Sequence, residues 1–300
     1  MPKIKRDICR NWDLYIMALP MIAYYIIFHY LPMYGVQIAF RNYNPVKGIA
    51  NSAFVGFKHF ERFLTSPISM QYIANTLRIS MLSLLFSYPL PILLALMLNA
   101  IPAPRYRKTL QTVLYLPHFV SVVIVVSIFT LFTNNQVGVI NQLIHALGGK
   151  AVDFTAASQF VPLYIISGIW SGAGWSTILY TGALASVNTE LYEAAVMDGA
   201  SKFKQIWHID LPAIVPTISI TLILAIGGIM SVGWEKVFLM QTPINISVSE
   251  IISTYTYKTG MLNAQFSYAA AIGLFNSVVN LMLLLVANGT SRRLSGNAIW

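Results

Sequence analysis

The chain has 300 residues, of which 56% are hydrophobic and only 10% are charged, and its formal net charge is +9. Because a soluble globular protein carries about 25% charged residues, this composition excludes an ordinary soluble enzyme as well as a disordered or fibrous chain. A membrane-spanning helix needs about 20 apolar residues, so length and composition predict an all-α integral membrane protein with about six transmembrane helices.

Six apolar segments recur along the chain, and each is long enough to cross a bilayer as a helix. They cover residues 14–40, 73–100, 110–132, 161–185, 214–232 and 268–287. The first follows the basic residues Lys3, Lys5, Arg6 and Arg10, but it is longer than the apolar part of a secretory signal and lacks a cleavage site of small residues. We therefore expect a cytoplasmic segment over residues 1–13, an uncleaved first span, and a single membrane domain over residues 14–300.

Lysine and arginine gather at one side of the predicted spans. Eleven of the 19 basic residues lie in four short segments, which precede the first span and follow the second, the fourth and the sixth. Short cytoplasmic loops are enriched in these residues, so both termini are expected in the cytoplasm. Segments 41–71 and 233–267 are then outside the cell, where their aromatic residues suit contact with another protein.

The polar residues give no sign of a cofactor site. The one cysteine, Cys9, excludes a disulfide framework, and the five histidines show no metal-ligand spacing. The basic residues do not alternate with aromatic residues on polar helices, which argues against a nucleic-acid partner. No G-x-x-x-x-G-K-[ST] phosphate loop occurs, so the chain cannot hydrolyse ATP by that route. We expect no metal and no cofactor on this chain, and an energy source on another protein.

The segment between the fourth and fifth spans, residues 187–212, is too polar to insert into the membrane but strongly patterned. Asn188 or Thr189 is suited to cap a helix, and Gly199 is suited to end it, because glycine enters the left-handed backbone region without strain. Ser201 is suited to cap a second short helix through Trp207. Proline lacks a backbone donor, so Pro212 is expected to stop that helix just before the fifth span. This segment predicts a helix-turn-helix on the cytoplasmic face.

This segment resembles the EAA signature of the membrane-spanning subunits of bacterial ABC importers. The matching residues are Glu193, Ala194, Ala195, Asp198, Gly199, Ile209, Leu211 and Pro212. The resemblance implies the transmembrane-domain fold of a type I ABC importer and a role for these residues in coupling to separate ATPase subunits, which bind ATP and Mg. It also implies a second homologous permease, two ATPase subunits and an extracellular solute-binding protein, in a bacterial plasma membrane.

Four other segments, 30–40, 56–60, 75–77 and 170–180, are similar to the sugar-permease branch of these importers, in particular to its oligosaccharide and polysaccharide importers. Carbohydrate is therefore the substrate class that the resemblance implies. Aromatic faces stack on sugar rings and polar side chains replace water around hydroxyl groups, so such residues inside spans are candidates for the substrate path. These candidates are Trp170, Trp175, Tyr180, Asn276 and Asn280. Packing between helices and anchoring at the membrane surface are alternative roles for each of them.

Two other functions fit a basic, aromatic membrane protein. A membrane-embedded glycosyl or lipid transferase would need a cluster of acids or histidines near one membrane face, whereas the ten acids of this chain are scattered. An ion-coupled secondary transporter would carry ionisable groups near the middle of its spans, and none lies there in the six predicted segments. Both remain alternatives to an ATP-driven importer subunit.

The predicted orientation can be tested with an impermeant thiol reagent on intact cells. Cysteine introduced at Lys108 or Lys204 is expected to stay unlabelled, whereas cysteine at Lys58 or Lys150 is expected to react, because the positive-inside rule places the first pair in the cytoplasm. Labelling of the first pair from outside would reverse the orientation.

Overall fold

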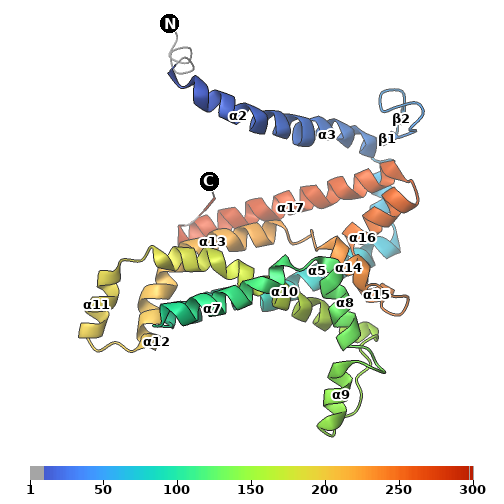
Figure 1. Ribbon diagram of the computed structural model, residues 1–300. Helices are drawn as coiled ribbons and strands as arrows, with labels where there is room; N and C mark the ends of the chain where they lie inside the picture. The colour runs from blue at the N-terminus through green and yellow to red at the C-terminus, as the bar shows by residue number, and fades with distance from the viewer. Residues whose placement is uncertain (1–9, 297, 300) are drawn as a thin grey trace. The chain divides into compact units, whose positions relative to one another are not determined.

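The computed structural model describes residues 10–296 and 298–299, and helices make up most of this part of the chain (Figure 1). Lys3, Lys5, Arg6, Cys9 and most of the expected N-terminal segment lie outside the described residues. The chain divides into two compact units. Unit 1 comprises Met1–Thr65 and Thr256–Phe275, and unit 2 comprises Ser66–Tyr255 and Asn276–Trp300.

Unit 1 contains a long N-terminal helix, a short hairpin and a few short helical turns. The long helix runs over Trp12–Phe40 and consists of α2 (Trp12–Tyr25), a π-helical turn (Ile26–Tyr30), α3 (Leu31–Met33) and a 3-10 segment (Tyr34–Phe40). The antiparallel strands β1 (Arg41–Asn42) and β2 (Ala53–Phe54) follow it, and then α4 (Lys58–Leu64). Within the unit, Phe63 packs on Phe275, and the guanidinium of Arg62 lies 4.2 Å from the ring centroid of Tyr268.

Unit 2 holds the remaining helices. Its elements are α5 (Pro67–Ser87), α6 (Pro89–Ala100), α7 (Pro104–Tyr115), a 3-10 turn (Leu116–Phe119), α8 (Val122–Phe132), α9 (Val139–Ala146), a 3-10 turn (Ala157–Gln159), α10 (Phe160–Ala185), α11 (Thr189–Met197), α12 (Lys202–Gln205), a π-helical turn (Ile206–Asp210), α13 (Leu211–Gly227), α14 (Trp234–Met240) and α15 (Ile246–Ser249). Three elements complete the chain: α16 (Ile252–Tyr257), a π-helical turn (Lys258–Leu262) and α17 (Phe266–Ser295), of which α16 and α17 each contribute residues to both units.

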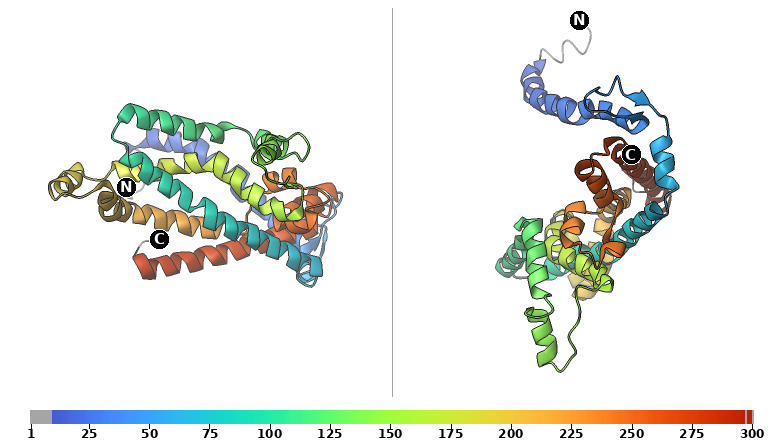
Figure 2. Two further views of the ribbon diagram at one scale, coloured as in Figure 1. Left: turned by 90° about the horizontal axis from the view of Figure 1, so that it is seen from below. Right: turned by 90° about the vertical axis from the view of Figure 1, so that its right-hand side faces the viewer.

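Helix α10 is the centre of unit 2. It packs against α5, α6, α7, α8 and α13, and also against the short helices α14 and α15 (Figures 1 and 2). At one end of α10, Phe160, Val161 and Ile165 form a buried cluster with Ile79 and Val237. At its other end a second cluster joins α10 to α6 and α13. These two clusters fix the position of the helix between its neighbours.

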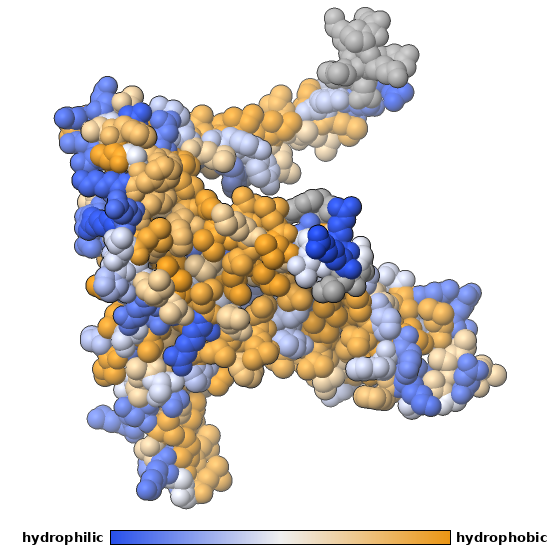
Figure 3. Space-filling model, turned by 180° about the vertical axis from the view of Figure 1, so that it is seen from behind, coloured by the Kyte–Doolittle hydropathy of each residue, from blue (hydrophilic) through white to orange (hydrophobic). Residues whose placement is uncertain are grey.

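The apolar helices confirm a membrane protein, because they bury little of their apolar surface inside the chain. Four helices are long and apolar enough to cross a bilayer: Trp12–Phe40, Pro67–Ala100, Lys202–Gly227 and Phe266–Arg293. In the apolar stretch of each of these helices, between 0% and 22% of the residues are buried inside the chain. Apolar side chains correspondingly cover most of the long helices on the face shown in Figure 3. Such surfaces are stable against lipid and not against water.

The third predicted span is not one straight helix. The segments Pro104–Phe119 and Val122–Phe132 meet at an angle of 97°, so the apolar segment over residues 110–132 is a bent pair of helices and counts as a span only if the pair is taken as one. Val120 and Ser121 have extended backbone conformations at the bend, and the hydroxyl of Ser121 accepts a hydrogen bond from the Ile124 amide to start α8. Pro117 contributes to the break, because proline offers no backbone donor to a continuing helix.

The fourth predicted span coincides with α10, which has 26 residues and is therefore about 39 Å long. Its sequence is less apolar than that of the four helices named above, because glycine, serine, threonine and aromatic residues interrupt its aliphatic residues. It is therefore long enough to cross a bilayer but is not one of the helices that are also apolar enough. The described chain thus has four such helices, or five if the bent pair is one span, where the sequence predicted about six. A central helix that packs on seven neighbouring helices has less contact with lipid and tolerates this composition.

Two π-helical turns explain how the apolar helices continue through Pro32 and Pro212. The turns Ile26–Tyr30 and Ile206–Asp210 are each followed by leucine and then by Pro32 or Pro212. In a π-helical turn an amide donates to the carbonyl five residues before it, instead of four as in an α-helix. The amides of Leu31 and Leu211 donate in this way to the carbonyls of Ile26 and Ile206. The helix therefore continues through the missing proline donor. The expectation that Pro212 ends the second short helix of the 187–212 loop is wrong, since Lys202–Gly227 is one continuous helix.

The contact between α10 and α7 depends on a residue without a side chain. A Cβ atom placed on Gly174 would lie 1.9 Å from the carbonyl oxygen of Leu114 and 2.5 Å from its carbonyl carbon. Both of these are backbone atoms and cannot rotate away. Only glycine lets α7 approach α10 this closely.

We predict that Gly174→Ala destabilises the protein by about 1–3 kcal/mol or more, because it overpacks this contact. Gly182→Ala on the same helix is the matched control, since a Cβ there meets nothing within 4 Å, and alanine is a better helix former than glycine. Thermal unfolding in detergent compares the two variants. Equal melting temperatures would contradict the close approach of α7 to α10.

Candidate functional site

The loop between α10 and α13 folds as a compact helix-turn-helix. The side chain of Asn188 accepts a hydrogen bond of 3.0 Å from the Glu190 amide and so caps α11. At the other end, the amides of Gly199 and Ala200 donate to the carbonyls of Val196 and Ala195. These two bonds form a Schellman motif, with Gly199 in the left-handed region at φ 71°. Ser201 then caps α12. Both caps and the glycine turn agree with the sequence analysis.

The α11–α12 loop, which we define as residues 187–212, presents most of its motif residues to its surroundings. Glu193, Ala194, Asp198, Gly199 and Pro212 are exposed, and Ala195, Ile209 and Leu211 are half-buried. Five larger apolar side chains are exposed as well. They are Leu191 (52%), Val196 (59%), Met197 (87%), Phe203 (74%) and Trp207 (59%). Since α11 has no buried residue, little packing within the chain holds it in place.

A buried carboxylate connects this loop to the transmembrane helices. Asp210 is only 2% exposed, and its Oδ1 accepts hydrogen bonds from the hydroxyl of Tyr192 in α11 and from the amide Nδ2 of Asn99 at the end of α6, the latter at 3.1 Å. Burial, and then the adjacent Asp210 carboxylate, raise the pKa of Tyr192 to about 12, so the phenol keeps the proton that it donates. One carboxylate thus joins α11, α6 and the helix that continues into α13.

Sequence analysis missed this three-way junction. Its only local signal is an aspartate inside the apolar sequence that follows Trp207, and neither Tyr192 nor Asn99 is marked by its neighbours in sequence. The junction lies beside a cavity of about 200 Å³ that Lys202, Gln205 and Ile206 also line. Next to this junction, Ile206 and Leu211 pack against a buried apolar cluster, which consists of Ala95, Leu96, Tyr180, Leu184 and Ile214. Leu211, predicted as a motif residue, therefore fixes the loop to the membrane helices.

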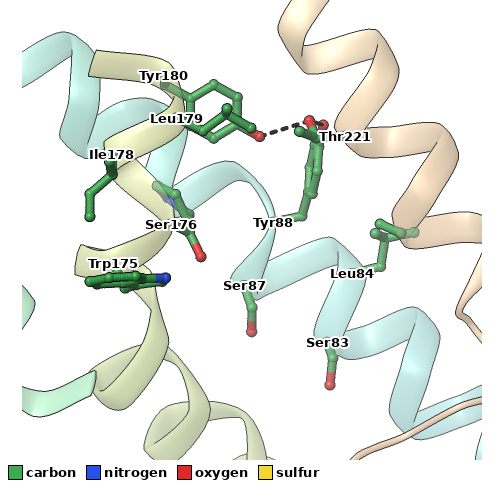
Figure 4. A pocket seen from close by; sticks show the side chains of 12 residues that line it. Ser83, Leu84, Ser87, Tyr88, Trp175, Ser176, Ile178, Leu179, Tyr180 and Thr221 are labelled. Atoms are coloured by element: carbon green, nitrogen blue, oxygen red, sulfur yellow. Dashed lines mark hydrogen bonds between the residues drawn. The ribbon is translucent and has the colours of Figure 1, made fainter. Parts of the chain in front are cut away.

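A second candidate site is a cavity of about 620 Å³ among α5, α6, α10 and α13. Its volume lies in the range of small-molecule pockets. It is lined by Ser83, Leu84, Ser87, Tyr88, Pro91, Trp175, Ser176, Ile178, Leu179, Tyr180, Thr221 and Ala225. Figure 4 shows the indole of Trp175 and the hydroxyl groups of Ser83, Ser87 and Ser176 around one open space. The walls thus combine an aromatic face with serine hydroxyls, as a carbohydrate requires.

Hydrogen bonds fix one wall of this cavity. The Thr221 hydroxyl lies 3.0 Å from the Tyr180 hydroxyl and 2.9 Å from the Tyr88 hydroxyl (Figure 4 shows these side chains). Tyr88 also donates to the carbonyl of Ile218 at 2.7 Å. Trp175 is 42% exposed and stacks on His118 with 4.5 Å between the ring centroids. The buried hydroxyl of Ser83, in contrast, has no hydrogen-bond partner in the described chain.

The structure separates the five predicted path residues into two groups. Trp175 and Tyr180 line the cavity. Trp170 does not, and its ring instead contacts Phe129 of α8 at 5.8 Å between centroids. The amide of Asn280 accepts from the Met230 amide at 3.0 Å and donates to the Ser231 hydroxyl at 2.8 Å. Asn276 Oδ1 is buried without a hydrogen-bond partner and lies outside the cavity lining.

The contacts of Asn280 also correct the end of the fifth predicted span. Helix α13 ends at Gly227, five residues before the predicted end at Val232, and Asn280 binds the chain just after this break. Sequence analysis also missed the serines of α5 and the residues Tyr88 and Thr221. They line one cavity only because α5, α6 and α13 pack together. Among the described residues, no three His, Cys, Asp or Glu side chains gather as a metal site.

Comparison with known proteins identifies the family. Residues 87–295 match the family described as "Binding-protein-dependent transport system inner membrane component". The chain belongs to this family. It is 45% identical to Protein LplB of Bacillus subtilis (strain 168) over 294 residues, which cover 98% of this chain and 91% of LplB. It is 44% identical to the polygalacturonan/rhamnogalacturonan transport system permease protein YteP of the same strain, over 96% of this chain and 90% of YteP.

Solved structures show the same fold. A bacterial ABC transporter involved in the import of the acidic polysaccharide alginate matches with a TM-score of 0.88 and 42% identity, over 98% of this chain and 99% of that one. A bacterial alginate ABC transporter in complex with an alginate pentasaccharide-bound periplasmic protein matches with a TM-score of 0.89 and 42% identity, over the same shares. The chain is therefore a transport permease of the ABC importer fold and a multi-pass membrane protein.

The junction at Asp210 can be tested by hydrogen exchange. We predict that Tyr192→Phe, which removes only the donated hydroxyl, raises amide exchange in α11 about tenfold or more, because a hydrogen bond to a charged group contributes about 1.5–3 kcal/mol. Tyr106→Phe on the exposed face of α7 is the control, since the hydroxyl of Tyr106 makes no hydrogen bond in the described chain. Unchanged protection of α11 in Tyr192→Phe would show that the junction does not hold the loop.

Proposed function

We propose that this chain is the permease subunit of an ATP-driven importer that forms, with a second homologous permease, the transmembrane path for an oligosaccharide or polysaccharide. An extracellular binding protein delivers the sugar, and two separate ATPase subunits bind ATP and Mg and supply the energy. The permease itself is not an enzyme. It lies in a bacterial plasma membrane with both termini in the cytoplasm.

The exposed apolar side chains of the α11–α12 loop carry the coupling part of this proposal. Five large apolar residues on one short loop are costly in water, and they lie on a segment that is too polar to insert into lipid. A protein partner is the remaining surface that can cover them. The exposed motif residues Glu193, Ala194, Asp198, Gly199 and Pro212 and the half-buried Ala195 lie on the same loop and are proposed to contact the ATPase subunit.

The junction at Asp210 supports a mechanical role for this loop. A displacement of α11 moves Tyr192, and Tyr192 shares the Asp210 carboxylate with Asn99 of α6. Ile209 and Leu211 are on the same continuous helix, which reaches the cavity wall at Thr221. A movement imposed by an ATPase subunit at the loop is therefore passed to two of the helices that line the cavity.

The cavity and the relatives together support carbohydrate as the substrate class. The names of the compared proteins refer to polygalacturonan, rhamnogalacturonan and alginate, which are all polysaccharides. In this chain the indole of Trp175 provides a stacking face, and Ser87 and Ser176 provide hydroxyl groups around it. We place Trp175 and Tyr180 in the path. Trp170, Asn276 and Asn280 lie outside the cavity lining. Asn276 stays a candidate, because its side-chain oxygen is buried with no hydrogen-bond partner among the described residues, whereas the Asn280 amide bonds to Met230 and the Trp170 ring contacts Phe129.

One reconstitution experiment separates coupling from substrate binding. The permease is purified from membranes in mild detergent with its partners, which are identified by mass, and is reconstituted for measurements of ATP hydrolysis and sugar uptake. Gly199→Val is expected to weaken ATPase association, because a β-branched residue at φ 71° costs on the order of 1–2 kcal/mol. Gly199→Asn is its control, since asparagine tolerates the left-handed region.

In the same experiment, Trp175→Ala is expected to leave ATPase association intact and to lower uptake about tenfold, because a stacked ring contributes about 0.5–1.5 kcal/mol beyond its buried area. If ATPase subunits do not copurify with the parental protein, the proposed function fails. Parental uptake in both Gly199→Val and Trp175→Ala would refute the roles given to the loop and the cavity.

A further inference from the structure

A single ammonium group lies against the outer half of α10. Lys236 of α14 donates a hydrogen bond of 2.7 Å from Nζ to the Tyr164 carbonyl oxygen. Its Nζ also lies 4.4 Å from the centroid of the Tyr164 ring. A Cβ placed on Gly168 would be 3.1 Å from the same atom. The ammonium therefore rests on the first turns of α10, between a ring face and a glycine.

This cation has no anionic partner in the described chain. No carboxylate forms an ion pair with it, and the neighbouring Glu235 is exposed. Burial alone lowers the pKa of Lys236 to about 8, with no contribution from a nearby charge. The group is thus mostly protonated at neutral pH, outside the membrane-spanning segments but largely out of water. A buried charge without a counter-ion is unfavourable, so an anion that arrives here is bound with a gain in free energy.

Lys236 also has unused donor capacity. An ammonium group carries three N–H bonds. The Tyr164 carbonyl takes one of them and the ring face of Tyr164 attracts the charge, so at least one donor is left for a ligand. A point charge with free donors suits a single carboxylate group.

The cavities place this cation close to the proposed sugar path. Tyr164 lines a cavity of about 240 Å³ together with Ser80, Ser83 and Gly233. That cavity shares Ser83, Leu84 and Ala225 with the cavity of about 620 Å³ that contains Trp175. None of the residues that line either cavity is acidic. An anionic substrate therefore meets no carboxylate on these walls.

The spacing along α10 suits an extended ligand. Gly168 and Trp175 are seven residues apart, so they lie on one face of the helix and about 10 Å from each other along its axis. A Cβ at Gly172, between them, would meet nothing within 4 Å, which leaves the face open. A saccharide that stacks one ring on Trp175 can extend along this face toward Lys236.

We propose that Lys236 binds the carboxylate of an acidic sugar residue and that the substrate of this permease is a uronate-containing oligosaccharide. The inference rests on the proposed function, since it names the substrate class of that same path. It explains why a half-buried lysine is kept at the outer end of a path whose lining residues carry no charged group. Lys236 is not itself a lining residue of either cavity, and it adjoins the path through its contact with Tyr164. A neutral oligosaccharide would gain nothing from this charge.

The test uses the complete importer with both permeases, the ATPase subunits and the binding protein in proteoliposomes. The probes are oligogalacturonate, oligomannuronate and a neutral galacto-oligosaccharide of the same length. Lys236→Gln removes the charge but keeps a donor for the Tyr164 carbonyl, and Lys236→Arg keeps the charge. Lys150→Gln is the matched control, because Lys150 is an exposed lysine in a loop of unit 2. Basal ATP hydrolysis and assembly are measured for every variant.

We expect the parental importer to transport an acidic probe and Lys236→Gln to lower that uptake tenfold or more, with assembly and basal ATP hydrolysis unchanged. Lys236→Arg is expected to keep at least half of the uptake, and Lys150→Gln all of it. Equal acidic uptake in Lys236→Gln and the parental protein would overturn the assignment. Uptake of only the neutral probe would overturn it too, and would leave the proposed function intact. An assembled importer that hydrolyses ATP and moves none of the probes would contradict both.

Discussion

The carboxylate of Asp210 is the interaction on which the arrangement of the α11–α12 loop depends. Helix α11 buries none of its side chains, so apolar packing cannot hold it against the membrane helices. Tyr192 and Asn99 instead bring two donors to one buried oxygen, and a carboxylate removed from water is stable only when its hydrogen bonds are made. The result is a loop that exposes apolar side chains and yet is fixed to α6 and α13.

The central helix α10 meets two opposing demands. It has to pack on seven neighbouring helices, and it has to leave space beside it for a substrate. Glycine residues meet both demands. Gly174 allows the backbone of α7 to approach closely, whereas Gly172 leaves open space beside the helix. The cost is a lower hydropathy than that of the other spans, which a helix surrounded by protein tolerates better than one in lipid. The half-buried cation of Lys236 and the indole of Trp175 both lie along this helix, the first as a contact from α14 and the second as its own side chain.

Proline and π-helical turns give the apolar helices their particular shape. In lipid every backbone donor and acceptor needs a partner within the protein, so a proline inside a span requires a local rearrangement. The chain shows two such rearrangements, at three of its prolines. At Pro32 and Pro212 the helix continues through a π-helical turn, and near Pro117 it breaks and bends by 97°. At Pro212 the first solution keeps the end of the α11–α12 loop and α13 on one continuous helix.

The sequence by itself determined the class of the protein, the caps of α11 and α12, the glycine turn at Gly199 and the family resemblance, because these depend on composition and on residues a few positions apart. Only the tertiary structure decided which polar residues meet. Asp210, Tyr192 and Asn99 are separated by up to 111 residues, and the Tyr88–Thr221 contact by 133. The division of the path residues into Trp175 and Tyr180 on the cavity wall and Trp170 and Asn280 in internal contacts had the same origin. A side chain's direction around a helix follows from the sequence, but the neighbour on that side is set by how distant helices pack.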